Sequence, residues 1–479
     1  MRKTKIVATF GPAIADPGVM RSILTSGLDV ARFNFSHGTH DEHAKMIADL
    51  RNVCKEMGVT VALMADTKGP EIRLDVFQGG HAELVTGSAF TLTTKPIVGD
   101  ASRAGISYED LPREISPGAH ILLDDGLIEL VVESVTDTDI TTMVATGGPI
   151  SDRKSVNVPG SKLNLPFISA QDRADIRFFV ETGFDIIAAS FVRSADDIME
   201  MRSELHRIDS GNKIKIVAKI ENADGVACAD AILSASDGLM VARGDLGVEV
   251  AYEELPIIQK ELIRKAVSQG KCVITATQML ESMINNPRPT RAETSDIANA
   301  IFDGTGAIML SGETSIGKYP VESLSAMAKI AERIERNINY RLLFRHGEYK
   351  PETTITNAIS QATVTTAHEL RTAAIITVTL SGDTARNVAK FRPLCPIIAC
   401  TPDPVTQRQL KLVWGVIPLL TKEEGDTAAL FSDAVETAQE SGYIKKGDLV
   451  VLTAGVPVGH SGTTNMLQVH VVGEKFIVG

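Results

Sequence analysis

The stretch KIKIVAKIENADGVACADAILSASDGLMVARGDLGVEV, residues 213–250, contains two apolar runs, at 214–220 and 238–242. Both runs have the length and composition of a buried strand. The residues between them, 223–234, favour a short helix. A strand, a helix and a second strand in this order predict two neighbouring parallel strands joined by a crossover.

Polar residues directly follow both predicted strands. Alternate side chains of a strand point to the same face, so Lys219 and Glu221 point the same way. A parallel neighbour lies about 4.8 Å away, which would bring Asp245 near Glu221. Two carboxylates with a lysine at one rim predict a site for a hard cation such as Mg²⁺. The alternative is that these charges only solvate strand ends, but convergence from two successive strands favours the site.

The same unit of apolar strand, polar turn and helix recurs from residue 3 onward. The predicted strands cover residues 5–10, 30–35, 61–65, 186–190, 214–220, 238–242, 272–276 and 307–310. The predicted helices cover residues 43–57, 170–181, 196–207, 255–268, 291–302 and 321–337. Strands that alternate with helices favour a parallel sheet, and eight such strands favour a closed (β/α)8 TIM barrel, an α/β fold with its chemistry at the carboxyl ends of the strands.

The helical periodicity stops once, where short strands and turns predict a small inserted β-barrel domain that is placed to act as a lid. Near residues 346–354 a polar link leads to a second α/β pattern, with a helix at 355–370, strands at 374–379 and 397–400, a helix at 384–391 and two strands after Gly447. Three domains are expected: the catalytic barrel over 1–74 and 158–345, the lid over 75–157, and a C-terminal α/β regulatory domain over 346–479.

The composition is that of a soluble globular protein of several domains, with 479 residues, 44% hydrophobic and 23% charged. The formal charge of −12 and the lack of a basic run argue against nucleic-acid binding. No apolar run is long enough for a membrane span or a signal peptide. Five scattered cysteines without a CxxC motif indicate reduced thiols in a cytoplasmic protein.

Two more strand ends carry polar residues. After the second strand, Arg32, Asn34 and Ser36 fall on one face, which suits an anion and a hard cation together. After the third strand, Asp66 and Thr67 add oxygen ligands beside further positive charge. Caps would explain Asp66 alone, but not several polar groups at one rim.

Two motifs do not support the function that they suggest. His37, His40 and His43 lie in a turn and a helix start without a carboxylate-fixed pair, which argues against zinc. Residues 312–318 have the spacing of a P-loop, but Tyr319 stands where a P-loop needs Ser or Thr for magnesium.

The loop after the strand at 374–379 could hold a phosphate at a helix start. Its candidate residues are Thr379, Ser381, Gly382 and Thr384, with the loop at 455–465 as a second wall. Asp383 in the same loop opposes an anion, and ordinary turn chemistry is the alternative reading.

The motifs RFNFSHG, DTKGPEIR, KIEN, MVARGDLG, ATQMLESM, NPRPTRAE and MLSGET occur in this order. With them the chain resembles the pyruvate kinase family over nearly its whole length, lid and last domain included. The resemblance implies a phosphotransferase of glycolysis that moves the phosphoryl group of phosphoenolpyruvate to ADP, giving ATP and, after protonation of the enolate, pyruvate. It also implies a homotetramer with a possible sugar-phosphate or nucleotide effector.

The resemblance implies roles for individual residues. Lys219 neutralises the transferring phosphoryl group, Arg32 holds the phosphate, and Glu221 and Asp245 ligate Mg²⁺. Further substrate contacts come from Gly244, Asp245 and Thr277, with Thr277 near the face that is protonated and Ser311 in the proton path.

The resemblance also implies cofactors: two Mg²⁺ ions, one arriving with ADP and both replaceable by Mn²⁺, and K⁺. The implied K⁺ ligands are Asn34, Ser36, Asp66 and Thr67. The implied nucleotide contacts are Asn34, Phe35, Ser36, His37, Arg73 and Lys154. Family members with a glutamate at the position of Glu71 tend to need potassium, whereas a lysine there substitutes for it, so we expect potassium dependence.

Because the chain begins almost at its first strand and stops at Gly479, we expect neither the amino-terminal arm of many animal members nor the extra C-terminal domain of some bacterial members. Two other readings were weighed. A magnesium-dependent aldolase or lyase on a related barrel has no use for a nucleotide lid or a potassium cluster. A non-enzymatic relative would have lost Lys219, Glu221 or Asp245, and all three are present.

Overall fold

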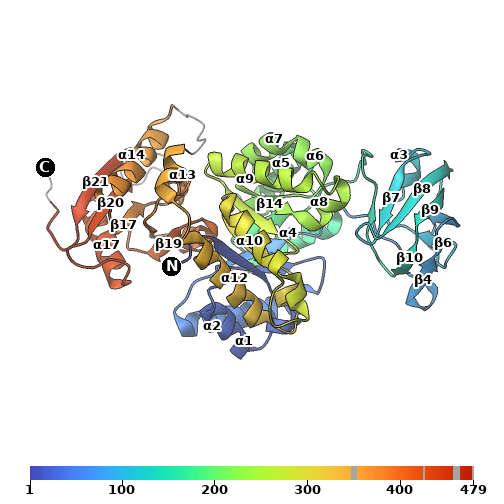
Figure 1. Ribbon diagram of the computed structural model, residues 1–479, viewed down its shortest axis with the longest axis horizontal. Coiled ribbons are helices and arrows are strands. Elements are labelled where there is room, and N and C mark those ends of the chain that lie inside the picture. The colour runs from blue at the N-terminus through green and yellow to red at the C-terminus, as the bar shows by residue number, and fades with distance from the viewer. Residues whose placement is uncertain (347–352, 424–426, 457–463, 477–479) are drawn as a thin grey trace.

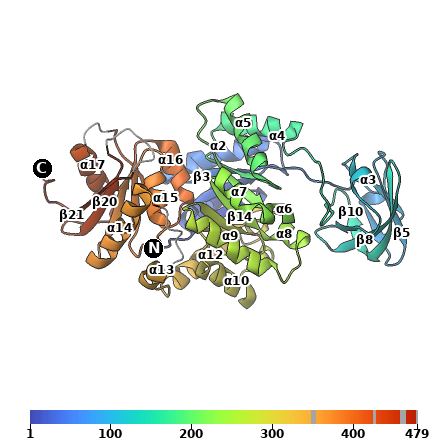
Figure 2. The ribbon, with the colours of Figure 1, turned by 90° about the horizontal axis from the view of Figure 1, so that it is seen from above.

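The structure is a computed structural model that describes residues 1–346, 353–423, 427–456 and 464–476. Three bodies lie in a row with the barrel in the middle (Figure 1). The inserted β domain lies at one end and the C-terminal α/β domain at the other, as the view from above also shows (Figure 2). The limits of the three domains, at 74/75, 157/158 and 345/346, remain our proposal.

Eight parallel strands close into a barrel in the order β1-β16-β15-β14-β13-β12-β3-β2, which confirms the predicted fold. Their bounds are β1 (Lys5–Thr9), β2 (Val30–Asn34), β3 (Ala62–Asp66), β12 (Ile186–Ala189), β13 (Lys215–Ile220), β14 (Gly238–Ala242), β15 (Cys272–Ala276) and β16 (Ala307–Leu310). The strands are buried on both faces, which is why they read as continuous apolar runs in the sequence.

Helices surround the barrel, and their apolar faces pack on the strands. The main ones are α1 (Pro17–Thr25), α2 (His40–Met57), α4 (Ala170–Thr182), α5 (Ala195–Ile208), α9 (Leu255–Ser268), α10 (Arg291–Phe302) and α12 (Pro320–Glu335). The helix predicted over 223–234 consists of two, α6 (Ala223–Ala227) and α7 (Ala229–Ala235). Helix α2 begins three residues earlier than predicted because Thr39 and Glu42 form a capping box at its start.

The inserted domain has a six-stranded sheet, β11-β7-β8-β9-β5-β6, and a two-stranded sheet, β10-β4, around one core. The strands are β4 (His81–Leu84), β5 (Ala89–Thr93), β6 (Arg103–Gly105), β7 (His120–Leu123), β8 (Ile128–Val135), β9 (Asp139–Thr146), β10 (Gly148–Ser151) and β11 (Val156–Asn157). Between β7 and β8 the chain makes a hairpin turn through three residues with positive φ, Asp124, Asp125 and Gly126.

The C-terminal domain is a five-stranded sheet in the order β19-β18-β17-β20-β21, parallel except for β21. Its strands are β17 (Ala374–Val378), β18 (Ile397–Thr401), β19 (Val416–Leu420), β20 (Leu449–Ala454) and β21 (Met466–Val471). Its helices are α14 (Ile355–Leu370), α15 (Asp383–Ala389), α16 (Pro404–Gln409) and α17 (Thr427–Glu440), and α13 (Tyr340–His346) leads into it from the barrel. The sequence patterns had not indicated β19, α16 or α17.

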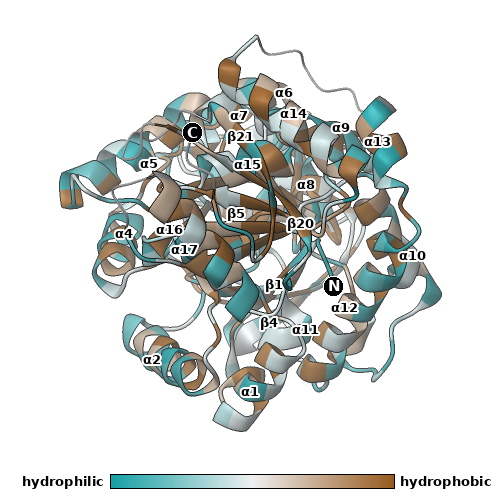
Figure 3. Cartoon of the chain, turned by 90° about the vertical axis from the view of Figure 1, so that its left-hand side faces the viewer, coloured by the Kyte–Doolittle hydropathy of each residue, from teal (hydrophilic) through white to brown (hydrophobic). Residues whose placement is uncertain are grey.

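The C-terminal domain packs against the amino ends of the barrel strands, away from the predicted site. Lys5 at the start of β1 donates to the Val416 carbonyl at 2.7 Å, and Arg408 pairs with Asp185 at 2.8 Å. Leu412 from η4 (Leu410–Leu412) joins the apolar cluster inside the barrel. In the end-on view the hydrophobic colour gathers along the central strands and the hydrophilic colour on outer helix faces (Figure 3). Among the described residues, no helix combines the length and apolarity that crossing a membrane requires.

Candidate active site

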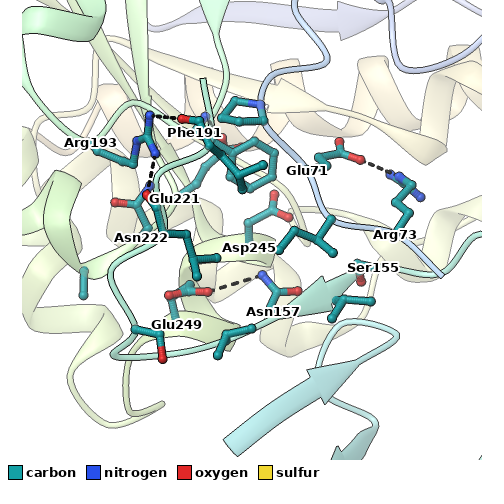
Figure 4. A pocket seen from close by; sticks show the side chains of 18 of the residues that line it. Glu71, Arg73, Ser155, Asn157, Phe191, Arg193, Glu221, Asn222, Asp245 and Glu249 are labelled. Carbon is teal, nitrogen blue, oxygen red and sulfur yellow. Dashed lines mark hydrogen bonds and ion pairs between the residues drawn. The ribbon is translucent and has the colours of Figure 1, made fainter. Parts of the chain in front are cut away.

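Two neighbouring cavities open at the carboxyl ends of the barrel strands. One, of about 380 Å³, lies between barrel and lid and is lined by Glu221 and Asp245 among others (Figure 4). The other, of about 880 Å³, is lined by Arg32 and Thr277. His37 lines both cavities. The two cavities therefore share a wall, and predicted site residues from several strand ends line one or the other.

Lys219, the fifth residue of β13, is the centre of a buried polar cluster. Its ammonium lies 2.9 Å from Glu221 Oε1 and 3.0 Å from Asp66 Oδ1. It also donates to Ser190 Oγ at 2.8 Å. Burial alone would lower the pKa of Lys219, but the Asp66 and Glu221 carboxylates outweigh it and raise that pKa above its ordinary value. The side chain is therefore held as a cation in a site with little water.

Arg32 is joined to the same cluster through Asp66. Its Nε donates to Asp66 Oδ2 at 2.6 Å, and its Nη1 donates to Thr9 Oγ1 at 2.7 Å. Burial raises the pKa of Asp66, but Arg32 and Lys219 outweigh that effect and hold the pKa below its ordinary value. Asp66 thus carries a negative charge between two cations, and it fixes both of them in place.

Glu221 is fully buried, and Asp245 lies on the neighbouring α8 (Arg243–Glu249). Glu221 Oε2 accepts a hydrogen bond of 2.5 Å from the amide of Phe191, a residue with φ of +56°. Burial raises the pKa of Glu221 to about 8, Lys219 opposes this rise and the charge of Asp245 adds to it. A divalent cation between the two carboxylates would remove this repulsion, so the pair fits Mg²⁺. Within the described residues, no group of three or more His, Cys, Asp and Glu side chains forms a metal site.

The predicted K⁺ ligands lie on neighbouring strand ends, because Asn34 pairs with Asp66 in the register of β2 and β3. Asn34 Oδ1 accepts from the Ser36 amide at 3.1 Å, and the Thr67 carbonyl accepts from Ser190 Oγ at 2.6 Å. A carboxylate offers about four acceptor positions, and Arg32, Lys219 and Ser190 use three on Asp66. The oxygen-rich donor set therefore leaves room for a monovalent cation.

Thr277 lies directly after β15 and lines the larger cavity. Its Oγ1 accepts from the Gly244 amide at 2.9 Å and donates to the Ala276 carbonyl at 2.6 Å. Ser311, directly after β16, lines the same cavity, and its buried hydroxyl has no hydrogen-bond partner in the described part of the chain. Both hydroxyls therefore lie where the sequence placed them, at strand ends beside Arg32.

The predicted nucleotide contacts divide into two groups. Arg73 and Lys154 line the cavity under the lid. Arg73 Nε donates to Glu71 at 2.5 Å (Figure 4). Lys154 pairs with Asp124 at 2.7 Å. The ring of Phe35 instead packs on Phe179, with ring centres 4.6 Å apart, and lines neither cavity. A role for Phe35 toward a nucleotide therefore rests on its backbone.

The remaining two histidines of the second strand end are engaged inside the protein. His40 lies 2.6 Å from Asp175 Oδ1, and His43 Nε2 lies 2.9 Å from the His37 carbonyl. Burial lowers the pKa of His43. These contacts account for both rings without a metal.

The candidate effector loop is closed on itself. Gly382, with φ of +84°, donates its amide to Thr379 Oγ1 at 2.9 Å. Ser381 Oγ donates to Asp383 at 2.6 Å, and Arg386 pairs with the same carboxylate at 2.8 Å. Asp383 thus takes the donors that an incoming anion would use. Thr384 bonds Thr464, and residues 457–463 of the second predicted wall lie outside the described residues.

Sequence reasoning had not identified several residues of the site. Ser190 bonds Asp66, the Thr67 carbonyl and Lys219, and Thr9 bonds Arg32. The sequence could have indicated Ser190, because this residue ends a predicted strand at the same rim of the barrel. The lid contact between Asn157 and Glu249, at 3.3 Å, gives no such signal since it joins segments far apart in the chain (Figure 4).

Comparison with known proteins shows the family to which the chain is similar. The family model described as "Pyruvate kinase, barrel domain" matches residues 1–324, and "Pyruvate kinase, alpha/beta domain" matches residues 357–470. A pyruvate kinase of Geobacillus stearothermophilus is 50% identical over 480 residues, which cover 100% of this chain and 82% of the relative. A pyruvate kinase of Clostridium acetobutylicum is 48% identical over 475 residues, which cover 98% of this chain and 100% of the relative.

The fold comparison points the same way. A crystal structure of a pyruvate kinase from Cryptosporidium parvum superposes with a TM-score of 0.92 and 38% identity, covering 98% of this chain and 96% of that chain. The resemblance expected from the motifs is therefore confirmed along nearly the whole chain.

Proposed function

This chain belongs to the pyruvate kinase family, and on that premise we propose that it transfers the phosphoryl group of phosphoenolpyruvate to ADP between barrel and lid. The protein is a transferase. In the reverse direction the phosphoryl group would be accepted by the enol oxygen of enolpyruvate, which is an oxygen of the alcohol type. The observation that carries the proposal is the ammonium of Lys219, held between Asp66 and Glu221, because Glu221 lines the same cavity as Asp245.

Lys219 and Arg32 provide the positive charge for the phosphoryl group. Both side chains are buried, and both are anchored by Asp66, Lys219 at 3.0 Å and Arg32 at 2.6 Å. Because the charges are fixed before the substrate arrives, they stabilise the transferring group without reorganisation. Lys219 neutralises charge on that group, and Arg32 holds the phosphate.

Glu221 and Asp245 are the residues that would hold Mg²⁺. When bound, the ion would act as a Lewis acid on the oxygens of the substrate, and Mn²⁺ has the same preference for carboxylate ligands. The buried carboxylate of Glu221 supports this assignment, because among the described residues its charge is compensated by Lys219 and by the Phe191 amide, and the charge of Asp245 lies nearby. Gly244, beside Asp245, is a further proposed substrate contact, for which its amide would exchange Thr277 Oγ1 for a substrate oxygen.

Thr277 and Ser311 serve the second half of the reaction. Once the phosphoryl group has left, a carbon atom of the enolate takes up a proton, and a site closed to bulk water protects the enolate meanwhile. Thr277 lines the larger cavity, and its proposed place is near the carbon that is protonated. The unpartnered hydroxyl of Ser311 supports a place for it in the path of the proton.

ADP, with its own Mg²⁺, fits under the lid. The cavity there is lined by His37, Arg73 and Lys154, and Arg73 and Lys154 supply positive charge for its phosphates. Asn34 and Ser36 would contact both K⁺ and the nucleotide, and Asp66 and Thr67 complete the K⁺ site. The ion pair of Glu71 with Arg73 places a glutamate beside this region, which supports potassium dependence.

Regulation and assembly follow from the family resemblance. We propose a homotetramer, whose mass in solution is measured directly by light scattering. The pairing of Asp383 with Ser381 and Arg386 disfavours an anionic effector at the 379–384 loop. The test is amide hydrogen exchange with and without inorganic phosphate, and slower exchange of this loop in phosphate would show that it binds the anion. The five free cysteines support a reducing, cytoplasmic location.

The test of the proposed function is ATP formation from phosphoenolpyruvate and ADP. The wild-type chain should form ATP, and Lys219→Met should abolish it. Lys215→Met is the matched control on the same strand, because Lys215 lies at the amino end of β13 and pairs with Asp237 at 3.3 Å. A wild-type chain that forms no ATP, or a Lys219→Met variant as active as Lys215→Met, would contradict the assignment.

A further inference from the structure

Thr277 has an unusual backbone conformation for its residue type. Its φ is +65°, and Gln278 follows with φ of +52°. A β-branched residue in the left-handed region is a genuine outlier, because its side chain crowds the backbone there. Such a conformation persists only where its surroundings hold it, and it occurs preferentially at functional sites. The contacts of Thr277 therefore have to supply the missing stability.

Arg243, the first residue of α8, supplies these contacts from behind the site. Its side chain is buried and lines neither cavity. Its Nη2 donates to the Thr277 carbonyl at 2.6 Å, and its Nε donates to the Ala276 carbonyl at 3.2 Å. The planar guanidinium thus spans the two consecutive carbonyls at the point where β15 turns into the left-handed pair.

The other edge of the guanidinium is fixed by two outer helices. Nη1 of Arg243 lies 2.8 Å from both carboxylate oxygens of Asp296 on α10 and 3.4 Å from Gln259 Oε1 on α9. A lysine could keep the charge near Asp296, but it has no fork that reaches two carbonyls at the same time. The position of the strand end therefore depends on the guanidinium shape and not only on its charge.

The next residue along the chain holds the side chain of Thr277. The Gly244 amide donates to Thr277 Oγ1 at 2.9 Å. Arg243 and Gly244 therefore fix the carbonyl and the hydroxyl of one threonine from adjacent positions. This arrangement links the end of β14, where Asp245 lies, to the end of β15.

We propose that Arg243 is a positioning residue for protonation of the enolate, which it serves by holding Thr277 in the left-handed conformation at the wall of the larger cavity. This inference rests on the proposed function, since it assigns Arg243 to the half-reaction in which Thr277 takes part. Arg243 itself touches no substrate. Its loss should slow proton transfer at carbon more than it weakens substrate binding.

The experiment compares Arg243→Lys with a matched control, Arg202→Lys. Arg202 has the same kind of partners, the Ala235 carbonyl at 2.9 Å and Asp237 at 2.9 Å, but lines neither cavity. Three quantities are measured on both variants: kcat and KM for phosphoenolpyruvate, the melting temperature, and the exchange of pyruvate methyl hydrogens with D₂O. The exchange breaks a C–H bond and forms a C–D bond at the same carbon, so it reports proton transfer without phosphoryl transfer.

Arg243→Lys should lower kcat and methyl exchange by about 10- to 100-fold, because a misplacement of about 1 Å has an effect of this size. Its KM for phosphoenolpyruvate should stay within about threefold, and Arg202→Lys should keep kcat within about twofold of wild type. The proposal is overturned if the two variants have equal kcat and equal exchange, or if Arg243→Lys raises KM and leaves kcat unchanged.

A fourth readout separates this proposal from the proposed function. If the wild-type chain forms no ATP, the proposed function has failed, and amide hydrogen exchange over residues 274–280 then tests the role of Arg243 as a brace. Faster exchange there in Arg243→Lys than in Arg202→Lys supports the brace, and equal exchange refutes it.

Discussion

Nζ of Lys219 lies 2.9 Å from Oε1 of Glu221, two residues further along the chain at the end of β13. The same ammonium bonds Asp66, so a carboxylate from another strand shares it. The cation and the proposed metal ligand are thus assembled by the barrel itself. Substitutions at neighbouring positions that move this pair should therefore lower kcat more strongly than they lower the free energy of unfolding.

Gly69 is a position where such a change can be made. It has φ of +69°, and an added Cβ would lie 2.9 Å from the Cβ of Ser190, which bonds Lys219. Gly69→Ala should lower the free energy of unfolding by about 1–2 kcal/mol through its backbone and kcat by about tenfold through Ser190. Gly58→Ala is the control, because Gly58 has φ of +65° with nothing within 4 Å of an added Cβ. Equal kcat in the two variants would contradict the role of Ser190.

Potassium dependence is the second prediction. Omitting potassium should lower kcat of the wild-type chain by about 10- to 100-fold, the size expected when one fixed charge of a closed site is lost. Glu71→Lys should bring the ratio of activities with and without potassium toward one, because it places an ammonium near the cation site. Glu83→Lys, at an exposed lid position, should leave that ratio unchanged. Equal wild-type activity in sodium and potassium would refute the prediction.

The contact between lid and barrel is the third. Asn157 on β11 donates to Glu249 on α8 at 3.3 Å (Figure 4). A double-mutant cycle with Asn157→Ala and Glu249→Ala should show a coupling of about 0.5–1.5 kcal/mol in KM for ADP, the value of an ordinary hydrogen bond. Asn164→Ala removes a similar bond, to Glu114 at 2.8 Å, and should leave that KM unchanged. Additive effects of Asn157→Ala and Glu249→Ala would mean that the contact does not hold the lid.

The fourth prediction concerns acid stability. Burial raises the pKa of Asp29, but Arg2 and Lys5 outweigh it and hold the pKa below its ordinary value. A carboxylate with a lowered pKa stabilises the fold above its unfolded pKa of about 3.9 and loses this contribution as the pH falls through the folded value. Asp29→Asn should thus lower the free energy of unfolding by about 2 kcal/mol at pH 7, and melting curves should converge with wild type below about pH 4.

Asp137→Asn, at an exposed turn of the lid, is the control for that series and should match wild type at every pH. A difference between Asp29→Asn and wild type that persists unchanged into acid would show that the charge of Asp29 is not its source.

Much of the barrel could be predicted from the sequence because its strands are buried on both faces. The bounds of β14, β15 and β16 agree with the apolar runs, since such a strand ends where its apolar run ends. In the C-terminal domain, two alternate residues of β19 are only partly buried, and the strand begins soon after a 3-10 turn. Its apolar run was therefore less distinct in the sequence. The break between α6 and α7 falls at Cys228, where neither a proline nor a glycine indicates the end of a helix.

For the site, the sequence could predict which strand ends converge but not how each side chain turns. The register of β13 against β14 brings Lys219, Glu221 and Asp245 together, as alternation required. Phe35 packs toward helix α4 instead, because an aromatic ring gains more from the apolar cluster with Phe179 than from solvent. The left-handed backbone of Thr277 has no sequence signal, since it is held by Arg243 and not by its own preference.

Manganese binding tests the central claim most directly, because Mn²⁺ reports the proposed cation site by electron paramagnetic resonance without any turnover. Glu221→Gln and Asp245→Asn should each weaken Mn²⁺ binding by at least about tenfold, since even groups behind metal ligands have effects of about 10- to 100-fold. Glu249→Gln, a change in the same cavity, should bind Mn²⁺ as the wild type does. Unchanged Mn²⁺ affinity in both Glu221→Gln and Asp245→Asn would contradict the account.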